Sequence, residues 1–355
     1  MSFVVKELTI EPRHDFRVEE VRAIHDRPLP ELLFRAQEVH REHHRPDEVQ
    51  LCALLSVKTG ACQEDCAYCA QSTRYSTGVQ PGRMLSRQDV VQAAERARAA
   101  GATRFCMGTA WRDAKDGPVF ESVLDLVRAV RGVGLEACLT MGMLTDEQCR
   151  RLAEAGLTIY NHNIDTSPAF YGSIITTHTQ EDRLATLARV RRAGMRICSG
   201  GIIGMGESVD DRCAMLATLA RLDPHPESVP INALVPIAGT PLANRPSVDP
   251  LQLVRVIATA RIIMPRSQVR LSAGRAALTR EAQVMSFVAG ANSIFYGEKL
   301  LTTGNPDVEA DQQLLRDAGL RPAPPGGHRN GNPERVPIPS RDGAPPAKPA
   351  GSPRD

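Results

Sequence analysis

Between about residues 50 and 320, charged helix-like stretches alternate with short apolar runs. Each helix-like stretch is rich in Ala and Leu and ends in a small residue followed by Gly, the usual stop signal of a helix. These junctions are Ala100-Gly101, Val133-Gly134, Ala155-Gly156, Ala193-Gly194 and Ala289-Gly290. The run after each Gly has the length of a strand. Strands that alternate with helices of about 10–15 residues predict βαβ units and a parallel sheet.

The same pattern predicts eight strands in all. They lie near residues 51–57, 103–107, 135–140, 157–162, 195–199, 229–234, 268–272 and 292–296. Eight βα units in a chain segment of this length fit a closed (β/α)8 barrel of the TIM type better than an open doubly wound sheet. The first strand is not followed by G-x-G-x-x-G, which weakens the case for a dinucleotide-binding domain. We therefore predict an α/β fold with the barrel at residues 51–320.

Two segments of different composition flank this barrel. Residues 1–50 are polar and contain a helix-like run from Pro30 to Arg45, which predicts an N-terminal helical extension. We interpret His40, His43 and His44 in this run as a solvated helix face. Residues 321–355 contain ten prolines and five glycines but only two large aliphatic residues. Such a segment cannot bury enough apolar surface to offset its chain entropy, so we predict a disordered tail.

Composition and charge exclude several functional classes. The chain is 42% hydrophobic, but no uninterrupted apolar run approaches the ~18 residues that a membrane span needs. Its first twenty residues are charged throughout, so we expect a cytoplasmic protein with no membrane association. The net charge is +2, whereas residues 321–355 alone carry +3, which leaves no basic face for a nucleic acid on the rest of the chain. Nine cysteines without an export signal favour metal binding or redox chemistry over disulfides.

The densest candidate site follows the first predicted strand. Cys62, Cys66 and Cys69 form a C-x3-C-x2-C motif on the side where barrel enzymes place their active sites. A helix with three core-facing cysteines is a weaker interpretation, because Gly60 and the polar residues 63–65 give such a stripe little apolar support. A zinc site would need a fourth ligand close by. Three thiolates instead suit a [4Fe–4S] cluster with one open iron.

This spacing, with Tyr68 just before the last cysteine, resembles the radical S-adenosylmethionine superfamily. The resemblance implies that the open iron binds the methionine part of S-adenosylmethionine and that electron transfer yields a 5′-deoxyadenosyl radical. The glycine run at residues 200–207 resembles the G-x-I-x-G-x-x-E element of that superfamily, which lies against the adenosine. The resemblance implies that Gly200, Gly204 and Glu207 contribute to cofactor binding.

A second group of candidates is spread over several strands. Cys106, Cys138 and Cys198 fall in the second, third and fifth predicted strands, and Arg270 falls in the seventh. Strand alternation places Arg104, Glu136 and Arg196 on the same faces as these cysteines. Because an unpaired buried ion is very costly, these faces indicate a polar barrel interior that encloses a ligand. The pattern leaves open whether the three cysteines pack the core or hold a second cluster.

Longer motifs resemble the biotin synthase family from about residue 20 to residue 320. They are TRFCMG at 103–108, YNHNIDTS at 160–167, SVPIN at 228–232, VRLSAGR at 269–275 and AGANSIFYG at 289–297. The resemblance implies sulfur insertion into dethiobiotin to form biotin, a cytoplasmic homodimer, and an electron donor of the flavodoxin or ferredoxin type.

The resemblance also implies a role for each matching residue. Cys62, Cys66 and Cys69 would ligate the [4Fe–4S] cluster, and Cys106, Cys138, Cys198 and Arg270 would ligate a [2Fe–2S] cluster that donates the sulfur. Asn163 and Asn232 would bind the ureido ring of the substrate, Asp165 the ribose of the nucleoside, and Tyr68 the cofactor. The three other cysteines, Cys52, Cys149 and Cys213, match no cluster position, and we interpret them as packing residues. Trp111 could form a wall of the site or anchor a loop.

Two other functions remain open at this point. The first is a different radical S-adenosylmethionine enzyme, a mutase or lyase, in which Cys106, Cys138 and Cys198 are structural. One cluster per chain would favour it. The second is a non-enzymatic sensor that binds zinc or an iron–sulfur cluster through Cys62, Cys66 and Cys69. A colourless protein that fails to bind S-adenosylmethionine would favour the sensor.

Overall fold

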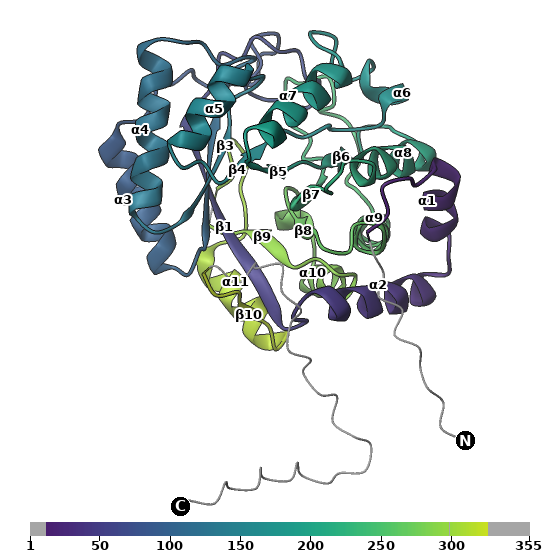
Figure 1. Ribbon diagram of the computed structural model, residues 1–355. Helices are drawn as coiled ribbons and strands as arrows, with labels where there is room; N and C mark the ends of the chain where they lie inside the picture. Colours follow the sequence, from purple (N-terminus) through teal and green to yellow (C-terminus); the bar gives the residue numbers. More distant parts are fainter. Residues whose placement is uncertain (1–11, 298, 326–355) are drawn as a thin grey trace, which may run out of the picture.

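The computed structural model describes residues 12–297 and 299–325. Its strands form a closed parallel barrel with helices around it (Figure 1). Around the barrel the strands are β1 (Glu48–Lys58), β2 (Arg104–Thr109), β3 (Glu136–Thr140), β4 (Ile159–Asn161), β5 (Arg196–Cys198) with β6 (Gly201–Ile203), β7 (Ser228–Ala233), β8 (Gln268–Leu271) and β9 (Ser293–Phe295). The barrel closes because β9 pairs with β1, with Leu51 opposite Ile294. The predicted fold class and all eight predicted strands are confirmed.

The helices outside the barrel begin and end at recognisable local sequence signals. They are α3 (Arg87–Ala99), α4 (Pro118–Gly132), α5 (Asp146–Glu154), α6 (Pro168–Tyr171), α7 (Gln180–Arg192), α8 (Val209–Ala220), α9 (Pro250–Ile263), α10 (Arg280–Val288) and α11 (Val308–Asp317). Capping boxes begin α3, α5, α7 and α8, each with a Ser or Thr that accepts a backbone hydrogen bond. The glycines of all five predicted helix–strand junctions have positive φ. The alternation in the sequence is therefore the alternation of the fold.

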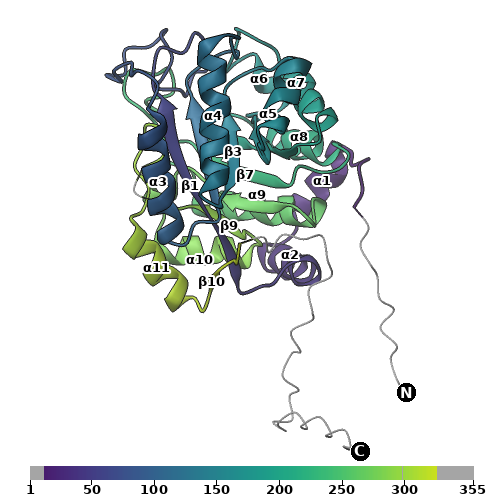
Figure 2. The same cartoon turned by 60° about the vertical axis from the view of Figure 1, so that its left-hand side comes forward.

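The N-terminal extension consists of α1 (Val18–His25) and α2 (Leu29–His43). Helix α1 packs against α8, and α2 packs against α9 along the lower edge of the barrel (Figures 1 and 2). The interpretation of the histidines of α2 as a solvated face is wrong for His40, which is only 2% exposed. The neighbouring His44 contacts the buried Arg261 through Nε2 at 2.7 Å. This face of α2 is docked on α9 and not solvated.

The predicted tail begins later than residue 321. Arg321–Pro322 form a short strand, β10, that pairs with the start of β1 outside the barrel. The backbone N–H of Ala323 donates to the carbonyl of Val49 at 2.9 Å, and Ala323 is buried. These three residues were predicted to be disordered and instead add to the fold. The rest of the predicted tail, from residue 326, lies outside the described residues.

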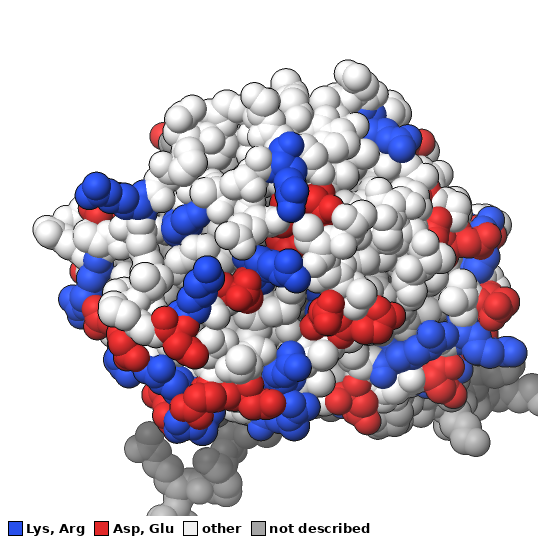
Figure 3. Space-filling model, turned by 90° about the horizontal axis from the view of Figure 1, so that it is seen from above, with Lys and Arg blue, Asp and Glu red and all other residues white. Residues whose placement is uncertain are grey.

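Surface charge on the side toward which β1 runs is of mixed sign. Figure 3, which views the molecule from above, shows Lys and Arg side chains interspersed with Asp and Glu side chains over part of this face, and much of the rest is uncharged. No large patch of one sign is visible there. Among the described residues, no helix is long and apolar enough to cross a membrane.

Candidate active site

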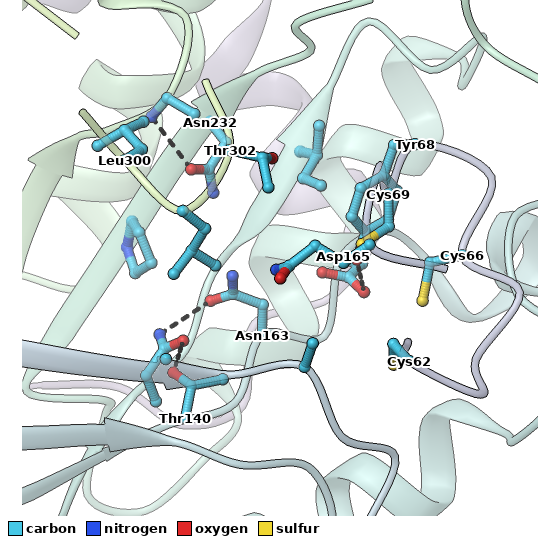
Figure 4. Close-up of a pocket in the computed structure, with 18 of the residues that line it drawn as sticks. Cys62, Cys66, Tyr68, Cys69, Thr140, Asn163, Asp165, Asn232, Leu300 and Thr302 are labelled. Carbon is cyan, nitrogen blue, oxygen red and sulfur yellow. Dashed lines mark hydrogen bonds between the residues drawn. The ribbon is translucent and has the colours of Figure 1, made fainter. Parts of the chain in front are cut away.

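A cavity of about 340 Å³ opens at the carboxyl ends of the strands. Its volume is within the usual range of small-molecule sites. The predicted site residues that line it are Cys62, Cys66, Tyr68, Cys69, Cys106, Cys138, Asn163, Asp165, Asn232 and Arg270. Four predicted residues do not line it: Cys198, Gly200, Gly204 and Glu207. Figure 4 shows the cysteine motif on one side of the cavity, the two asparagines on the other, and Asp165 between them.

The cysteine motif lies in an irregular loop after β1, not in a helix. Two backbone hydrogen bonds within the loop hold its conformation: Cys62 N donates to Gln71 O at 2.9 Å, and Thr73 N donates to Cys62 O at 2.8 Å. Asp65 connects the loop to the segment after α6, because its carboxylate accepts a hydrogen bond from Thr176 N at 2.9 Å. Burial raises the pKa of Cys69 to about 11 and raises those of Cys62 and Cys66. A metal that binds these thiols therefore has to displace their protons.

Asp165 is a buried carboxylate with one oxygen in use and one free. Its Oδ2 accepts from Tyr68 OH at 2.8 Å and pairs with Arg183 Nη2 at 3.0 Å. Its Oδ1 has no partner among the described residues, although the side chain is only 1% exposed. A buried oxygen without a partner is costly. Because Asp165 lines the cavity, this oxygen is suited to accept a hydrogen bond from a hydroxyl group of a ligand.

The glycine run allows the backbones of neighbouring elements to approach closely. A Cβ on Gly200 would lie 1.9 Å from Pro230 O, and a Cβ on Gly201 would lie 2.6 Å from Asp165 O. Glu207 closes the turn by accepting from the N–H of Gly204 at 2.8 Å. Ile202 is the residue of this run that reaches the cavity. Direct contact of Gly200, Gly204 or Glu207 with a cofactor stays a prediction.

The two asparagines predicted to bind substrate present amide groups to the cavity. Asn163 Oδ1 accepts from Gly200 N at 3.2 Å, and no described residue accepts from its Nδ2. Asn232 Nδ2 donates to Gly201 O at 2.9 Å, and its Oδ1 accepts from Ala273 N at 3.2 Å. Each amide retains hydrogen-bonding capacity beyond these contacts. The backbone contacts fix their orientation.

The second thiol group lies deeper in the barrel. Cys106 and Cys138 face each other in register on β2 and β3, and both line the cavity. Cys198 is fully buried behind them, and its Sγ lies 3.7 Å from Arg270 Nη1. The hydrogen bond to Cys138, with Arg270 and Arg104 nearby, lowers the pKa of the Cys106 thiol. The structure thus brings the three strand cysteines and Arg270 together.

Buried positive charge surrounds these deep thiols. Arg104 and Arg270 are each 1% exposed, and Arg104 pairs with Glu136 Oε2 at 3.1 Å. Glu136 also pairs with Arg196, and the two arginines lower the pKa of its carboxyl group to about 2. Arg104 Nη1 has no partner among the described residues. Glu136 is shared by Arg104 and the partly exposed Arg196, and no described carboxylate pairs with the buried Arg270, so this interior fits an anionic occupant such as thiolates with sulfide.

Among the described residues, no three His, Cys, Asp or Glu side chains converge on a position for a single metal ion. A [4Fe–4S] cluster places each thiolate on its own iron, whereas a [2Fe–2S] cluster is held by two protein ligands on each iron. The donor sets and the surrounding charge fit clusters better than one ion.

The sequence did not predict a buried hydrogen-bond network that connects Asp165 to the cysteine loop through Arg183, His178 and Glu64. Arg183 Nε donates to His178 Nε2 at 2.9 Å, and Arg183 Nη1 donates to Asn163 O at 2.7 Å. His178 Nδ1 contacts Glu64 Oε2 at 2.7 Å, which links the network to the cysteine loop. Arg183 lies on α7 and His178 just before it, more than 100 residues from Glu64 along the chain. The one sequence signal is that Glu64 lies within the cysteine motif, which could have suggested that Glu64 belongs to the site.

The structure also shows the surroundings of Trp111 and of the three cysteines that match no cluster position. Trp111 lines the cavity. Cys149 and Cys213 are fully buried in the main apolar core, which confirms them as packing residues. Cys52 is different, because its Sγ lies 3.3 Å from Arg270 Nη2 and not in that core.

Comparisons with known proteins agree with this geometry. Residues 56–219 match the family model of the Radical SAM superfamily, whose members use a [4Fe–4S] cluster and S-adenosylmethionine. Residues 230–321 match the Biotin and Thiamin Synthesis associated domain. In solved structures, the fold is similar to methylornithine synthase (18% identity, TM-score 0.72, covering 87% of this chain and 94% of that one). It is also similar to the FeFe-hydrogenase maturase HydG from Carboxydothermus hydrogenoformans (17% identity, TM-score 0.74, 87% and 76% covered).

Curated relatives are much closer in sequence. Biotin synthase from Sorangium cellulosum is 63% identical over 318 residues, which cover 90% of this chain and 91% of the relative. Biotin synthase from Methylobacterium nodulans is 64% identical over 309 residues, with 87% and 93% covered. The enzyme from Synechococcus elongatus is 62% identical, with 86% and 96% covered. With such relatives matched over nearly their whole length, this chain belongs to the biotin synthase family of radical S-adenosylmethionine enzymes.

Proposed function

We propose that this chain catalyses the insertion of sulfur into dethiobiotin to give biotin, with a [2Fe–2S] cluster as the sulfur donor. The observation that carries the proposal is the order of groups along one cavity. The three loop thiols line one side of the cavity, and Asn163, Asp165 and Asn232 also line it. Cys106, Cys138 and Arg270 line it from the barrel strands, and Cys198 is buried 3.7 Å from Arg270. A substrate held by the asparagines would lie between the two thiol groups.

The chemistry explains why two cofactor sites are needed. The carbons that receive sulfur bear unactivated C–H bonds, on which acid–base catalysis has little effect, so a cofactor must supply the reactive species. When bound, the [4Fe–4S] cluster and S-adenosylmethionine supply a 5′-deoxyadenosyl radical, and the [2Fe–2S] cluster supplies sulfide. The task of the protein is to hold these groups in line and to exclude water.

Cys62, Cys66 and Cys69 would hold the first cluster, on a loop fixed by Asp65. Asp165 would accept a ribose hydroxyl at its free Oδ1, while Tyr68 and Arg183 hold its Oδ2 in place.

Asn163 and Asn232 would bind the ureido ring of the substrate. A cyclic urea has N–H donors and a carbonyl acceptor, and an amide side chain matches both. Both amides are oriented by backbone contacts with residues 200–201 and 273, so they need not reorganise when substrate binds. The chain elements that carry the asparagines, after β4 and in β7, are part of the rigid barrel.

Cys106, Cys138, Cys198 and Arg270 would hold the second cluster. The buried Arg104 and Arg270 near these thiols favour an anionic group at this depth. We further propose a homodimer and a partner electron carrier of the flavodoxin or ferredoxin type, as the family resemblance implies.

The test compares the parent protein with a Cys106/Cys138/Cys198→Ala variant, both prepared anaerobically. We expect about six irons per chain in the parent and about four in the variant, because a [4Fe–4S] and a [2Fe–2S] cluster hold four and two. With reductant, S-adenosylmethionine and dethiobiotin, the parent should form biotin and 5′-deoxyadenosine. The variant should not form biotin. A parent with only four irons, or a variant that still makes biotin, would refute the second cluster as the sulfur donor.

A further inference from the structure

Cys52 occupies a position that core packing does not explain. It lies on β1 with its side chain fully buried inside the barrel, and its Sγ is 3.3 Å from Arg270 Nη2. The other terminal nitrogen of the same guanidinium, Nη1, is 3.7 Å from the Sγ of Cys198. Arg270 therefore lies between two sulfur atoms. One belongs to the proposed cluster ligands, and the other has no assigned role.

The surroundings of Cys52 are polar and positively charged. Its Sγ is 3.6 Å from Ser293 Oγ, which also accepts from Arg270 Nε at 3.1 Å. In the barrel register, Cys52 is directly opposite Arg104 on β2. The fully buried Arg104 keeps its Nη1 without a partner among the described residues. An unpaired cationic donor beside a thiol indicates a place built for a negative charge, which a sulfur bound to metal would carry.

The two other non-cluster cysteines make the contrast clear. Cys149 on α5 and Cys213 on α8 are as deeply buried as Cys52, but they lie among aliphatic side chains of the main core. A thiol is a soft ligand that iron binds far better than it binds a nitrogen of a guanidine. Cys52 thus has a side chain that binds iron strongly, and only the guanidinium of Arg270 separates it from the proposed cluster ligand Cys198.

We propose that Cys52 is an alternative ligand for the iron assigned to Arg270, so that the second cluster can be held by three thiolates and Arg270 or by four thiolates. The inference rests on the [2Fe–2S] site proposed above. In the exchange, the Fe–N bond to Arg270 breaks and an Fe–S bond to Cys52 forms. The thiol proton passes to the released guanidine nitrogen, which becomes a guanidinium, and no electron is transferred. The existing contact between Arg270 Nη2 and the Cys52 Sγ gives the proton a direct path.

The test uses iron and sulfide content together with visible absorption and Mössbauer spectra of anaerobic full-length protein. Four variants are compared with the parent: Arg270→Ala, Cys52→Ala, the double variant, and Cys149→Ala combined with Arg270→Ala as the matched control. We expect each single variant and the control to hold about six irons, and the double variant to hold about four. The Arg270→Ala spectrum should shift to that of a cluster with four thiolates.

The outcomes separate this inference from the proposed function. If the parent itself holds only about four irons, the second cluster is absent and the proposed function fails with it. If the parent holds about six, the inference is overturned by either of two results: loss of two irons in Arg270→Ala, or their retention in the double variant. Arg270→Met, which fills more of the vacated volume, replaces Arg270→Ala throughout if the alanine variant does not fold, as judged by its [4Fe–4S] content and thermal unfolding.

Discussion

At the scale of single residues, the cavity depends on groups that are held in costly states. Asp165 has a φ of 65°, in the left-handed region that few side chains other than Asn and Asp adopt, and it keeps a buried carboxylate oxygen without a partner. Gly201 has no room for a side chain. Strain and unsatisfied polar groups of this kind gather at functional sites, because the ligand completes them.

Asp165→Asn tests the role of that carboxylate. Asn tolerates the same backbone conformation and has almost the same shape, but it leaves Arg183 without its charged partner. We expect binding of S-adenosylmethionine to weaken by roughly 10- to 100-fold, since hydrogen bonds to charged groups contribute about 1.5–3 kcal/mol. Anaerobic titration calorimetry of the iron-loaded protein measures this. Asp182→Asn, an exposed helix-cap residue on α7, is the control and should bind normally. Equal affinities in both variants would contradict the role.

Gly201→Ala tests the close approach of the loop after β4. The added Cβ would lie 2.0 Å from Met215 Sδ and 2.6 Å from the carbonyl oxygen of Asp165, and the latter is backbone that cannot move aside. We expect a loss of about 1–3 kcal/mol in the free energy of unfolding, typical of an overpacked core. Gly132→Ala at the end of α4 has open space and should be neutral or slightly stabilising. Urea unfolding of both variants decides the matter, and an unchanged midpoint for Gly201→Ala would show that the loop can relax.

At the scale of elements, local signals were enough to predict helices and strands but not every contact between them. The strands are short segments between helix-like stretches, and capping boxes and glycines mark the helix ends. The C-x3-C-x2-C motif was predictable because its ligands are neighbours in the chain. Arg183 and His178 were not, because an arginine in a charged helix has no local feature that distinguishes it. The solvated position predicted for His40 is wrong for the same reason, because only the docking of α2 on α9 buries this histidine.

The docking of α2 on α9 makes the protein sensitive to acid. Burial, together with the nearby Arg261, lowers the pKa of both His40 and His44. Both remain neutral in the folded protein at pH values where they are protonated in the unfolded chain, with a pKa of about 6.5. The unfolded state therefore binds more protons, and stability falls as the pH drops below about 6.5. Each histidine can contribute up to about 1.4 kcal/mol to the loss at pH 5.5.

A His40→Gln/His44→Gln variant checks this assignment. Its free energy of unfolding should fall less between pH 7.5 and pH 5.5 than that of the parent, by up to about 3 kcal/mol. The comparison is of two pH differences, so any direct cost of the substitutions cancels. His25 and His225, whose pKa values burial also lowers, remain in both proteins and act equally. The same loss in parent and variant would mean that the two histidines of α2 do not titrate between folded and unfolded states.

At the scale of the whole molecule, the closed barrel brings together residues that the sequence keeps far apart. Cys52, Cys198 and Arg270 come from three strands and meet only because β9 returns to β1. The closed barrel was predictable, because it follows from counting βα units. The contact of Cys52 with Arg270 was not, because it depends on the stagger of the strands and on the depth of each side chain within the barrel, which no local pattern encodes. The predicted end of the folded chain is likewise wrong, because β10 is only two residues long and lies at the start of the Pro-rich segment.

Two truncations measure where the folded chain ends. A chain that stops at residue 320 loses the backbone hydrogen bonds from Arg321 to Asp47 and from Ala323 to Val49, and the ion pairs of Arg321 with Asp47 and Glu48. A chain that stops at residue 325 keeps them. We expect the shorter chain to be less stable by about 1–2 kcal/mol, because two hydrogen bonds contribute about 1 kcal/mol each and exposed ion pairs little. Its thermal midpoint should lie roughly 2–4 °C below that of the longer chain.

The Pro-rich composition of residues 326–355 predicts that the longer truncation behaves like the full chain. Equal midpoints for the two truncations would place the boundary back at residue 320.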